Sequence, residues 1–557
     1  MDILRESTVT VRDDTIVVRS PFYMKELLKS VPGARWDKER KAWTYPASGL
    51  SAATLEERLP PVIERDAVFV ELAEAGVADA AAGEVIRHSE TLDDVPLTLR
   101  PAWTHQRQAY WFAQGKPGAM LAMDMGTGKS KVALDLVQNS GDRLVLIVCP
   151  SSVVDVWPLE VERNIANPRD WQALPLRKGS VKRRADELKQ AVDLARMRGT
   201  GLIVVVNYEA AWRAELGKAL LATEWDTVIA DEIHRIKSPN GKASKFMTSL
   251  GAKVPRRLGL TGTPAPHSPM DIYAQYRFLD VSVFGTSFYG YRNDYAVMGG
   301  YLGKQVLRFK NEAELNRLFY SIGFRVMAED VLDLPPQQHM ERYCDLEPAA
   351  QRMYANLRDE FVAWLADGTE VTAPNVLVKL LRMQQMTSGH LPNPETEILE
   401  QVSAAKSALL ADTLDGLAVD EPVVVFGRFQ ADLDTIHEIA AAQGRASVEL
   451  SGRVNELAAW QAGDAPVLAV QIQAGGVGID LTRARYCVYY SVGYSLGDYQ
   501  QSLARVHRPG QTRPVFYYHL MARGTVDEAV MRALRHRKEV VESLLAEIKT
   551  EGRATDG

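Results

Sequence analysis

The sequence is poor in cysteine and contains no long hydrophobic run. Its 557 residues include 3 cysteines, Cys149, Cys344 and Cys487, and none of them forms a CxxC pair. This spacing argues against a zinc knuckle and a disulfide framework, and it fits a reducing intracellular compartment. The longest apolar runs, LVLIV at 144–148 and LIVVV at 202–206, are far too short to span a bilayer. The N-terminus lacks the basic-then-apolar pattern of a signal peptide. We therefore expect a cytoplasmic protein, in a bacterium or a phage-infected host, with no membrane partner.

An excess of positive charge is also absent. The chain has 65 Lys and Arg against 71 Asp and Glu, a formal net charge of −6, so it is not a simple polycationic coat for nucleic acid. A local basic groove could still bind nucleic acid. The hydrophobic share of 46% and the charged share of 24% are ordinary for a globular protein. They exclude disorder, collagen and coiled-coil fibre for most of the chain.

The chain alternates short apolar runs with helical stretches in two separate regions, which is typical of parallel sheets flanked by helices. At about 150 residues per domain, the length corresponds to roughly three to four domains. We expect an α/β fold with two tandem lobes. The predicted order is a small α+β unit, a helical connector, a first α/β lobe, a mainly helical region, a second α/β lobe and a polar tail, at residues 1–60, 61–95, 96–330, 331–420, 421–545 and 546–557.

The segment MDMGTGKS, which begins at Met123, matches a phosphate-binding loop. Gly126 and Gly128 would let backbone N–H groups surround phosphate oxygens, Lys129 can reach the β- and γ-phosphates, and Ser130 can bind Mg²⁺. A helix-forming stretch follows, and a helix N-terminus favours an anion. Met123 stands where the general pattern has glycine. The alternative interpretation is a glycine-rich turn before an ordinary helix.

Two adjacent acids, Asp231 and Glu232, follow the apolar run at 228–230. In a nucleotide hydrolase Asp231 would complete the Mg²⁺ shell, and Glu232 would orient the attacking water. His234 follows directly, which favours a role in coupling, although a histidine at a turn or in a core is also possible. The alternative interpretation of the acids is a solvated turn at a strand end. A phosphate loop about one hundred residues upstream, after another apolar strand, favours the catalytic interpretation.

Four segments occur in the order seen in a known family. MDMGTGKS, DEIH at 231–234, LTGTP at 260–264 and QSLARVHRPGQ at 501–511 resemble the motifs of superfamily 2 helicase-like ATPases, and more narrowly those of Swi/Snf-type double-stranded DNA translocases. VCPSSVVDVWPLE, VVVFGRF and QAGGVGIDLTRA support the resemblance, which covers roughly residues 96–540. It implies two RecA-like P-loop lobes and a DNA-dependent ATP hydrolase that uses ATP and Mg²⁺. DEIH replaces DEAH and Pro509 replaces the usual Ile, but no charged catalytic group is lost.

The resemblance also implies roles for individual residues. Gln106 would read adenine, Thr261 and Thr263 would link hydrolysis to strand contact, and Arg505 and Arg508 would reach the γ-phosphate from the second lobe. The two arginines are three positions apart and would lie on nearly one face of a helix; the alternative is a basic, solvated helix end. The remaining residues expected in the ATP site are Gly126, Thr127, Gly128, Lys129, Ser130, Gly478 and Asp480.

Contacts with DNA would need cations and N–H donors along a groove. Within the two lobes the candidates are Ser151, Ser152, Lys237 and Thr482.

The segment VPGARWDKERKAWTYP at 31–46 resembles the small substrate-recognition domain of HepA-related, annealing-helicase-type fork remodellers. In that reading Arg35 and Lys41 belong to a DNA-facing rim. Trp36, Trp43 and Tyr45 would otherwise be core anchors, an interpretation we favour for two of the three.

The sequence thus predicts an ATP-dependent motor that moves on duplex or branched DNA and remodels it in replication, recombination or repair. A strand-separating helicase and an ATP-switched DNA clamp are the alternatives. RNA as the substrate is a further possibility, which the Swi/Snf-like segments disfavour.

Overall fold

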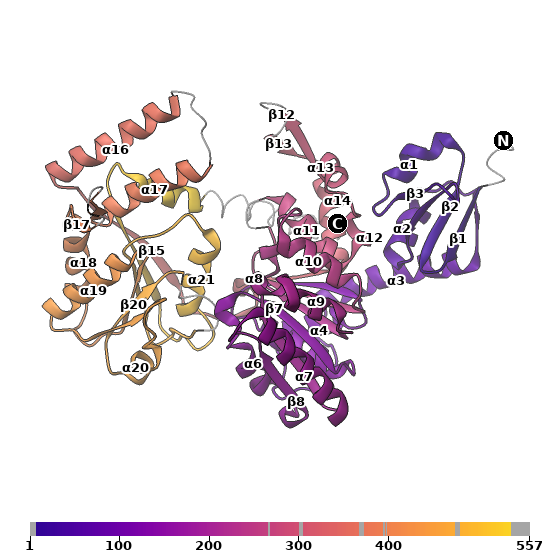
Figure 1. The fold of residues 1–557 in the computed structure, drawn as a ribbon, viewed down its shortest axis with the longest axis horizontal. Helices are drawn as coiled ribbons and strands as arrows, with labels where there is room; N and C mark the ends of the chain where they lie inside the picture. The colour runs from indigo at the N-terminus through magenta and orange to yellow at the C-terminus, as the bar shows by residue number, and fades with distance from the viewer. Residues whose placement is uncertain are drawn as a thin grey trace. The chain divides into compact units, whose positions relative to one another are not determined.

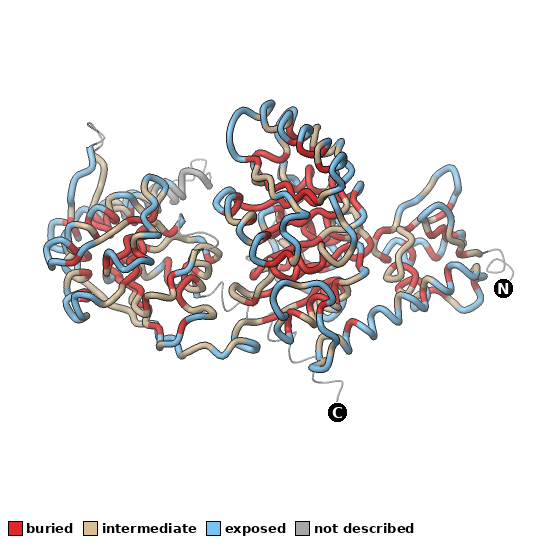
Figure 2. The backbone as a smooth tube through the Cα atoms, turned by 90° about the horizontal axis from the view of Figure 1, so that it is seen from below, coloured by how far each residue is buried: buried red, intermediate tan, exposed pale blue. Residues whose placement is uncertain are grey.

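The computed structural model describes residues 7–265, 268–299, 305–366, 373–393, 396, 398–473 and 479–535. Contacts between residues divide the chain into two compact units, with the change from the first to the second between Val331 and Leu332 (Figure 1). Each unit has a buried interior with exposed helices and loops around it (Figure 2).

The first unit begins with a small α+β domain. Its sheet has the order β3-β4-β2-β1-β5, with strands at Thr8–Arg12 (β1), Thr15–Arg19 (β2), Arg35–Asp37 (β3), Ala42–Pro46 (β4) and Glu64–Arg65 (β5). The helices are α1 (Lys25–Lys29), α2 (Gly49–Arg58) and α3 (Ala67–His88), with a short 3-10 turn at Phe22–Met24. Tyr45 is buried in the core of this domain, whereas Trp36 on the edge strand β3 is 50% exposed.

The α+β domain packs against the lobe that follows it in the same unit. Arg58 of α2 forms an ion pair of 2.7 Å with Glu314 of α14 (Glu312–Ile322), and Leu50 packs against the core of the lobe. The backbones approach closely at Gly285, whose φ is +72°, because a β carbon there would lie 2.8 Å from the nitrogen of Gly33.

The lobe is built on a parallel sheet with the order β14-β6-β11-β10-β7-β9-β8. Strands β6, β7 and β10 are buried along their whole length, as expected when helices cover both faces of a parallel sheet. The strands are β6 (Gly118–Met123), β7 (Leu144–Cys149), β8 (Trp171–Pro175), β9 (Gly201–Asn207), β10 (Thr227–Asp231), β11 (Arg256–Thr261) and β14 (Gly323–Val326).

Helices connect these strands, and one antiparallel hairpin lies outside the sheet. The hairpin pairs β12 (Ala296–Gly299) with β13 (Gln305–Phe309). The helices are α4 (Thr104–Ala113), α5 (Lys129–Asn139), α6 (Trp157–Asn164), α7 (Val181–Arg198), α8 (Tyr208–Ala211), α9 (Ala214–Ala222), α10 (Lys242–Gly251), α11 (Ile272–Leu279), α12 (Val281–Phe284), α13 (Phe288–Tyr295), α14 and α15 (Ala328–Val331).

The second unit has a parallel sheet with the order β15-β22-β21-β18-β20-β19. Alternate residues of β18 belong to two separate hydrophobic clusters, so helices cover both faces here too. The strands are β15 (Gln337–Cys344), β18 (Val423–Gly427), β19 (Ser447–Leu450), β20 (Val467–Gln471), β21 (Tyr486–Tyr489) and β22 (Val515–Ala522). The helices are α16 (Pro348–Ala366), α17 (Ala373–Thr387), α18 (Ala405–Asp415), α19 (Gln430–Ala442), α20 (Leu457–Ala462) and α21 (Leu496–Val506), and β16 (His390–Pro392) pairs with β17 (Leu399–Gln401).

The two parallel sheets with their helices confirm the predicted α/β fold class. Strand β15 lies within the region that the sequence predicts to be mainly helical, yet it forms the edge of the second sheet beside β22. Within the described part of the chain, no helix is both long enough and apolar enough to cross a membrane.

Candidate nucleotide-binding and hydrolysis site

The phosphate loop connects β6 to α5 and depends on two glycines in the left-handed region. The φ angles are +82° at Gly126 and +89° at Gly128, which favour glycine over other residues. Space gives a second reason at Gly128, because a β carbon there would lie 2.3 Å from Nε2 of Gln106. Lys129 and Ser130 open α5 directly after the loop, where backbone N–H groups lack helical partners and suit phosphate oxygens.

Asp124 holds the loop together and ties it to the neighbouring strand. Its carbonyl accepts hydrogen bonds from Oγ1 of Thr127 (2.6 Å) and Nζ of Lys129 (3.2 Å). Its own N–H donates to the carbonyl of Val326 (2.9 Å), and its carboxylate accepts from the N–H of Ala328 (3.1 Å). The loop is therefore fastened to β14 and to the residues that follow it.

Gln106 lies against the phosphate loop rather than in solvent. Its Oε1 accepts from the N–H of Trp103 (3.1 Å), and its Nε2 donates to the carbonyl of Thr127 (3.0 Å). Nε2 of His105 lies 2.9 Å from the same carbonyl, and burial lowers the pKa of His105. Sequence reasoning missed His105, although it is adjacent to Gln106. Recognition of adenine by Gln106 stays a prediction.

Asp231 closes strand β10 and is held by three hydrogen bonds. Its carboxylate accepts from Nε1 of Trp157 (3.1 Å) and from the N–H of Glu232 (3.0 Å), and its carbonyl accepts from the hydroxyl of Tyr208 (2.8 Å). Burial and, next, the charge of Glu232 raise the pKa of Asp231 to about 7, while Lys129 acts in the opposite direction. Trp157 and Tyr208 were not predicted as site residues. The only signal for Trp157 is its place in the family-like segment VCPSSVVDVWPLE.

The acid pair fits a divalent cation. Both acids are buried, and Oε2 of Glu232 has no hydrogen-bond partner among the described residues. Two adjacent buried carboxylates are costly without a compensating charge. Carboxylate and hydroxyl oxygens, as in Asp231 and Ser130, are hard ligands suited to such a cation.

His234 connects Glu232 to the next strand. Its Nδ1 lies 3.1 Å from Oγ1 of Thr261 and 3.4 Å from Oε2 of Glu232. The N–H of Thr263 also donates to Oγ1 of Thr261 (3.0 Å). Because β10 and β11 are neighbours in the sheet, the structure brings together Glu232 and all three residues predicted to couple hydrolysis to DNA.

Replacing Thr261 by valine tests this connection. Valine keeps the shape but loses the hydroxyl that contacts His234 and Thr263, so we expect the stimulation of ATP hydrolysis by DNA to fall by about 2–30-fold, the usual size of such coupling. The measurement is the steady-state ATPase rate with and without duplex DNA. The matched control is Thr227→Val at the beginning of the neighbouring strand β10, where an equally buried hydroxyl donates to Asp142. Equal effects of the two substitutions would contradict a coupling role.

In the second unit, Arg505 and Arg508 lie beside the loop that contains Asp480. The carbonyl of Arg505 accepts from the N–H of Leu481 (3.0 Å), and Nη1 of Arg508 donates to the carbonyl of Ile479 (3.0 Å). Asp480 accepts from the N–H and the hydroxyl of Thr482. The structure thus brings these predicted residues together within this unit, whereas Gly478 lies outside the described residues.

The expectation that both arginines lie on one helical face was wrong. Helix α21 ends at Val506, so Arg508 lies beyond it, in the turn before Pro509. A residue that precedes proline is disfavoured in the helical region. The interpretation as a solvated helix end also fails for Arg505, which is only 6% exposed.

The residues predicted to contact DNA are distributed over separate parts of the chain. Ser151 and Ser152 are exposed in the 3-10 turn Ser151–Val153 after β7, and Nζ of Lys237 lies 3.9 Å from a carboxylate oxygen of Asp271. Thr482 is half-buried in the second unit. Arg35 and Lys41 are exposed on the α+β domain. Their contacts with DNA stay predictions.

The phosphate loop and the acid pair at the ends of parallel strands define a P-loop nucleotide hydrolase. The model of the SNF2-related domain matches residues 97–392, more than half of the chain, and that of the helicase conserved C-terminal domain matches residues 405–510. The chain belongs to the SNF2-related family. It is a DNA-dependent ATP hydrolase of the Swi/Snf type, as the resemblance implied.

Several known proteins are similar to this chain. A Caenorhabditis elegans homolog of SWI/SNF-related matrix-associated actin-dependent regulator of chromatin subfamily A-like protein 1 is 26% identical over 94% of this chain and 73% of its own length. Putative protein p41 of Acyrthosiphon pisum secondary endosymbiont phage 1 is 25% identical over 76% of this chain and 93% of its own. The mouse DNA annealing helicase and endonuclease ZRANB3 is 28% identical over 84% of this chain, which spans 43% of that protein. The solved Sulfolobus solfataricus SWI2/SNF2 ATPase core in complex with dsDNA is 20% identical, with a TM-score of 0.38, over 82% of this chain and 95% of that one.

Proposed function

We propose that this protein uses ATP hydrolysis to move along duplex or branched DNA and to remodel it in replication, recombination or repair. The observation that carries the proposal is the contact path from Glu232 through His234 to Thr261. This path joins the acid that would act in hydrolysis to a segment whose family resemblance implies contact with the translocated strand. A DNA annealing helicase among the relatives supports a role in DNA processing, and a phage relative supports the proposed location in the cytoplasm of a bacterium or a phage-infected host.

We assign ATP as the nucleotide and Mg²⁺ as the cation. Lys129 would bind the β- and γ-phosphates, and Ser130 and Asp231 would hold Mg²⁺, which neutralises charge on the transferring phosphoryl group. Glu232 would orient the attacking water. Arg505 and Arg508 would supply positive charge from the second unit.

The α+β domain is the proposed determinant of the DNA structure that is acted on. Arg35 and Lys41 are exposed there, and exposed cations favour contact with the phosphate backbone. The half-exposed ring of Trp36, the residue after Arg35, packs edge-on against Trp43, with ring centroids 5.5 Å apart. This arrangement supports recognition of a junction or fork.

A triplex-displacement assay tests translocation, because a motor that travels on duplex DNA removes a third strand without separating the other two. We expect ATP-dependent displacement, absent in Lys129→Ala, and ATPase activity stimulated more by duplex or forked DNA than by single strands or RNA. We also expect Arg35→Ala/Lys41→Ala to reduce the preference for forked DNA, and the control pair Lys189→Ala/Lys245→Ala, at exposed cations of α7 and α10, to leave it unchanged.

Other outcomes would favour the alternatives. Efficient unwinding of a long duplex would favour a strand-separating helicase. ATP-dependent DNA affinity without displacement of the third strand would favour a clamp. Stimulation only by single strands or RNA would refute duplex translocation.

A further inference from the structure

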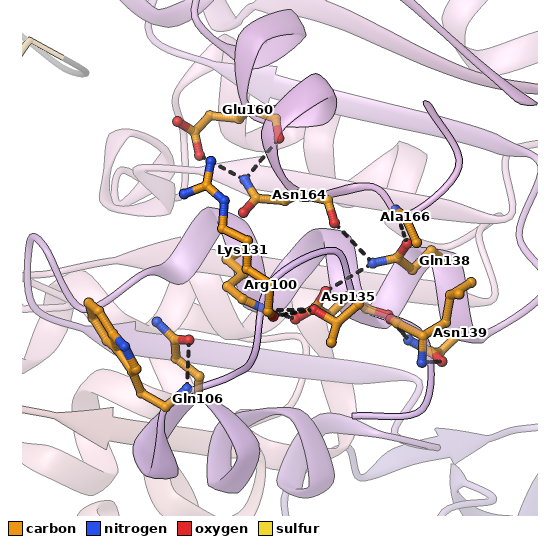
Figure 3. A network of polar contacts seen from close by, with 12 residues as sticks. Arg100, Gln106, Lys131, Asp135, Gln138, Asn139, Glu160, Asn164 and Ala166 are labelled. Carbon is orange, nitrogen blue, oxygen red and sulfur yellow. Dashed lines mark hydrogen bonds and ion pairs between the residues drawn. The ribbon is translucent and has the colours of Figure 1, made fainter. Parts of the chain in front are cut away.

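Residues 97–106 form the segment that leads into Gln106, and its first residue, Leu97, is hydrogen-bonded to Asn139 at the end of α5. Nδ2 of Asn139 donates to the carbonyl of Leu97 (2.7 Å), and its Oδ1 accepts from the N–H of Leu97 (2.9 Å). One side-chain amide therefore satisfies both backbone groups of a residue 42 positions earlier in the chain. Asn139 is held in turn by the carbonyl of Asp135 (2.8 Å), as Figure 3 shows.

Lys131 makes the second attachment. Its ammonium donates to the hydroxyl of Thr98 (2.8 Å) and to the carboxylate of Asp135 (2.5 Å). The Thr98 hydroxyl donates to the carbonyl of Arg100 (2.8 Å). Lys131 and Asp135 are both buried. Burial raises the pKa of Asp135, and the hydrogen bond and charge of Lys131 oppose that rise.

The same segment is fastened to the phosphate loop at its other end. There, Oε1 of Gln106 accepts a hydrogen bond from the N–H of Trp103, and its Nε2 donates one to the carbonyl of Thr127. Residues 97–106 are thus attached at one end to α5 and at the other end to the phosphate loop, which runs directly into α5. A shift at Leu97 or Thr98 would be passed along ten residues or fewer to the amide of Gln106.

We propose that Asn139 and Lys131 are positioning residues that set the amide of Gln106 against the phosphate loop, so that the enzyme selects the adenine base of its nucleotide. They act through the 97–106 segment and contact no part of the nucleotide themselves. The inference rests on the proposed role of Gln106 in the ATP site.

Gln138 provides a matched control on the same helix. Its Nε2 donates to Oδ1 of Asp135 (2.9 Å) and to the carbonyl of Asn164 (3.3 Å), and its Oε1 accepts from the N–H of Ala166 (2.8 Å). Like Asn139 it is a half-buried amide near the end of α5. Its bonds to Asn164 and Ala166 lead to the end of α6 and beyond (Figure 3), and none of its three bonds reaches residues 97–106, although it shares Asp135 with Lys131 and Asn139.

The experiment compares Asn139→Ala with Gln138→Ala in the full chain, saturated with duplex DNA. For each variant, KM and kcat are measured with ATP and with GTP, together with Tm. We expect Asn139→Ala to raise KM for ATP by about three- to tenfold, the effect of one or two lost hydrogen bonds. KM for GTP should change less, so that the preference for ATP, measured as the ratio of the two KM values, falls. The kcat should be unchanged. Gln138→Ala should keep the preference.

Thr98→Val is the second variant, because Lys131→Ala would leave the buried Asp135 without its cation and destabilise the fold. Valine removes the attachment of Lys131 to the segment while the Lys131–Asp135 pair remains. We expect the same loss of preference for ATP as in Asn139→Ala. A lower Tm with an unchanged ratio of KM values in both variants would overturn the proposal.

Gln106→Ala distinguishes the positioning role of Asn139 and Lys131 from its premise, the recognition of adenine by Gln106. If Gln106→Ala loses the preference for ATP while Asn139→Ala behaves like Gln138→Ala, only the positioning role is refuted. If wild type shows no preference, or Gln106→Ala keeps it, adenine reading by Gln106 is refuted and the inference falls with it. Neither result depends on whether the protein displaces a triplex strand. The triplex assay therefore reports failure of the proposed motor function separately from these KM measurements.

Discussion

Replacing Arg505 by alanine is expected to lower DNA-stimulated ATP hydrolysis by about 10³–10⁵-fold, the contribution of an arginine that neutralises a transferring phosphoryl group. The residue is 6% exposed on α21, and its carbonyl holds Leu481 next to Asp480. Its side chain can thus be removed without removing the backbone contact that organises this loop. The measurement is kcat at saturating ATP and duplex DNA.

Two further variants test whether the loss of rate in Arg505→Ala is specific to this guanidinium. Arg485→Ala removes a guanidinium from the same unit, where it pairs with Glu421 at 3.2 Å, and should leave kcat nearly unchanged. Arg505→Lys should recover only part of the rate, since lysine carries the charge but not the planar fork of donors. A normal kcat in Arg505→Ala, with Tm unchanged, would rule out a catalytic role for this arginine.

The second large effect is expected for Glu232→Gln. Glutamine keeps the size of the side chain but cannot act as a base, and loss of a positioned base typically costs about 10²–10⁴-fold in rate. Removing one of two adjacent buried charges also relieves their repulsion, so affinity for ATP should not weaken. The two quantities to measure are the single-turnover rate of hydrolysis and the Kd of a fluorescent ATP analogue.

Glu209→Gln serves as the control for this substitution. Glu209 is a carboxylate in the same lobe, with a half-exposed side chain, and lies 3.8 Å from Arg235. Its replacement should leave hydrolysis within the range of wild type. If Glu232→Gln hydrolysed ATP at the wild-type rate, another group would have to orient the attacking water.

The features predicted from the sequence were those encoded over a few neighbouring residues. Gly126, Gly128 and Lys129 have a fixed spacing that phosphate binding requires, and apolar runs of strand length gave the parallel sheets. Asp231 was recognisable because it ends such a run. Each of these signals lies within one loop or at one strand end.

The contacts between these segments could not be predicted, because they depend on which strands become neighbours. His234 meets Thr261 only because β11 lies beside β10, and Asn139 meets Leu97 across 42 residues of chain. Trp157 on α6, 74 positions earlier in the chain, donates a hydrogen bond to Asp231. The end of α21 was different: Pro509 was visible in the sequence and already disfavoured a helix through Arg508.

The attachment of Asp124 to Val326 and Ala328 has a mechanical consequence. The chain leaves the first unit through β14, the strand paired with β6, which carries the phosphate loop. A load applied to the connection after Val331 would therefore act on the pairing of β14 with β6 and on the backbone bond and the carboxylate bond of Asp124. The carbonyl of this same residue accepts from the ammonium of Lys129. The connection between the two units and the proposed phosphate-binding lysine thus share one residue, so force on that connection would reach the proposed nucleotide site through Asp124.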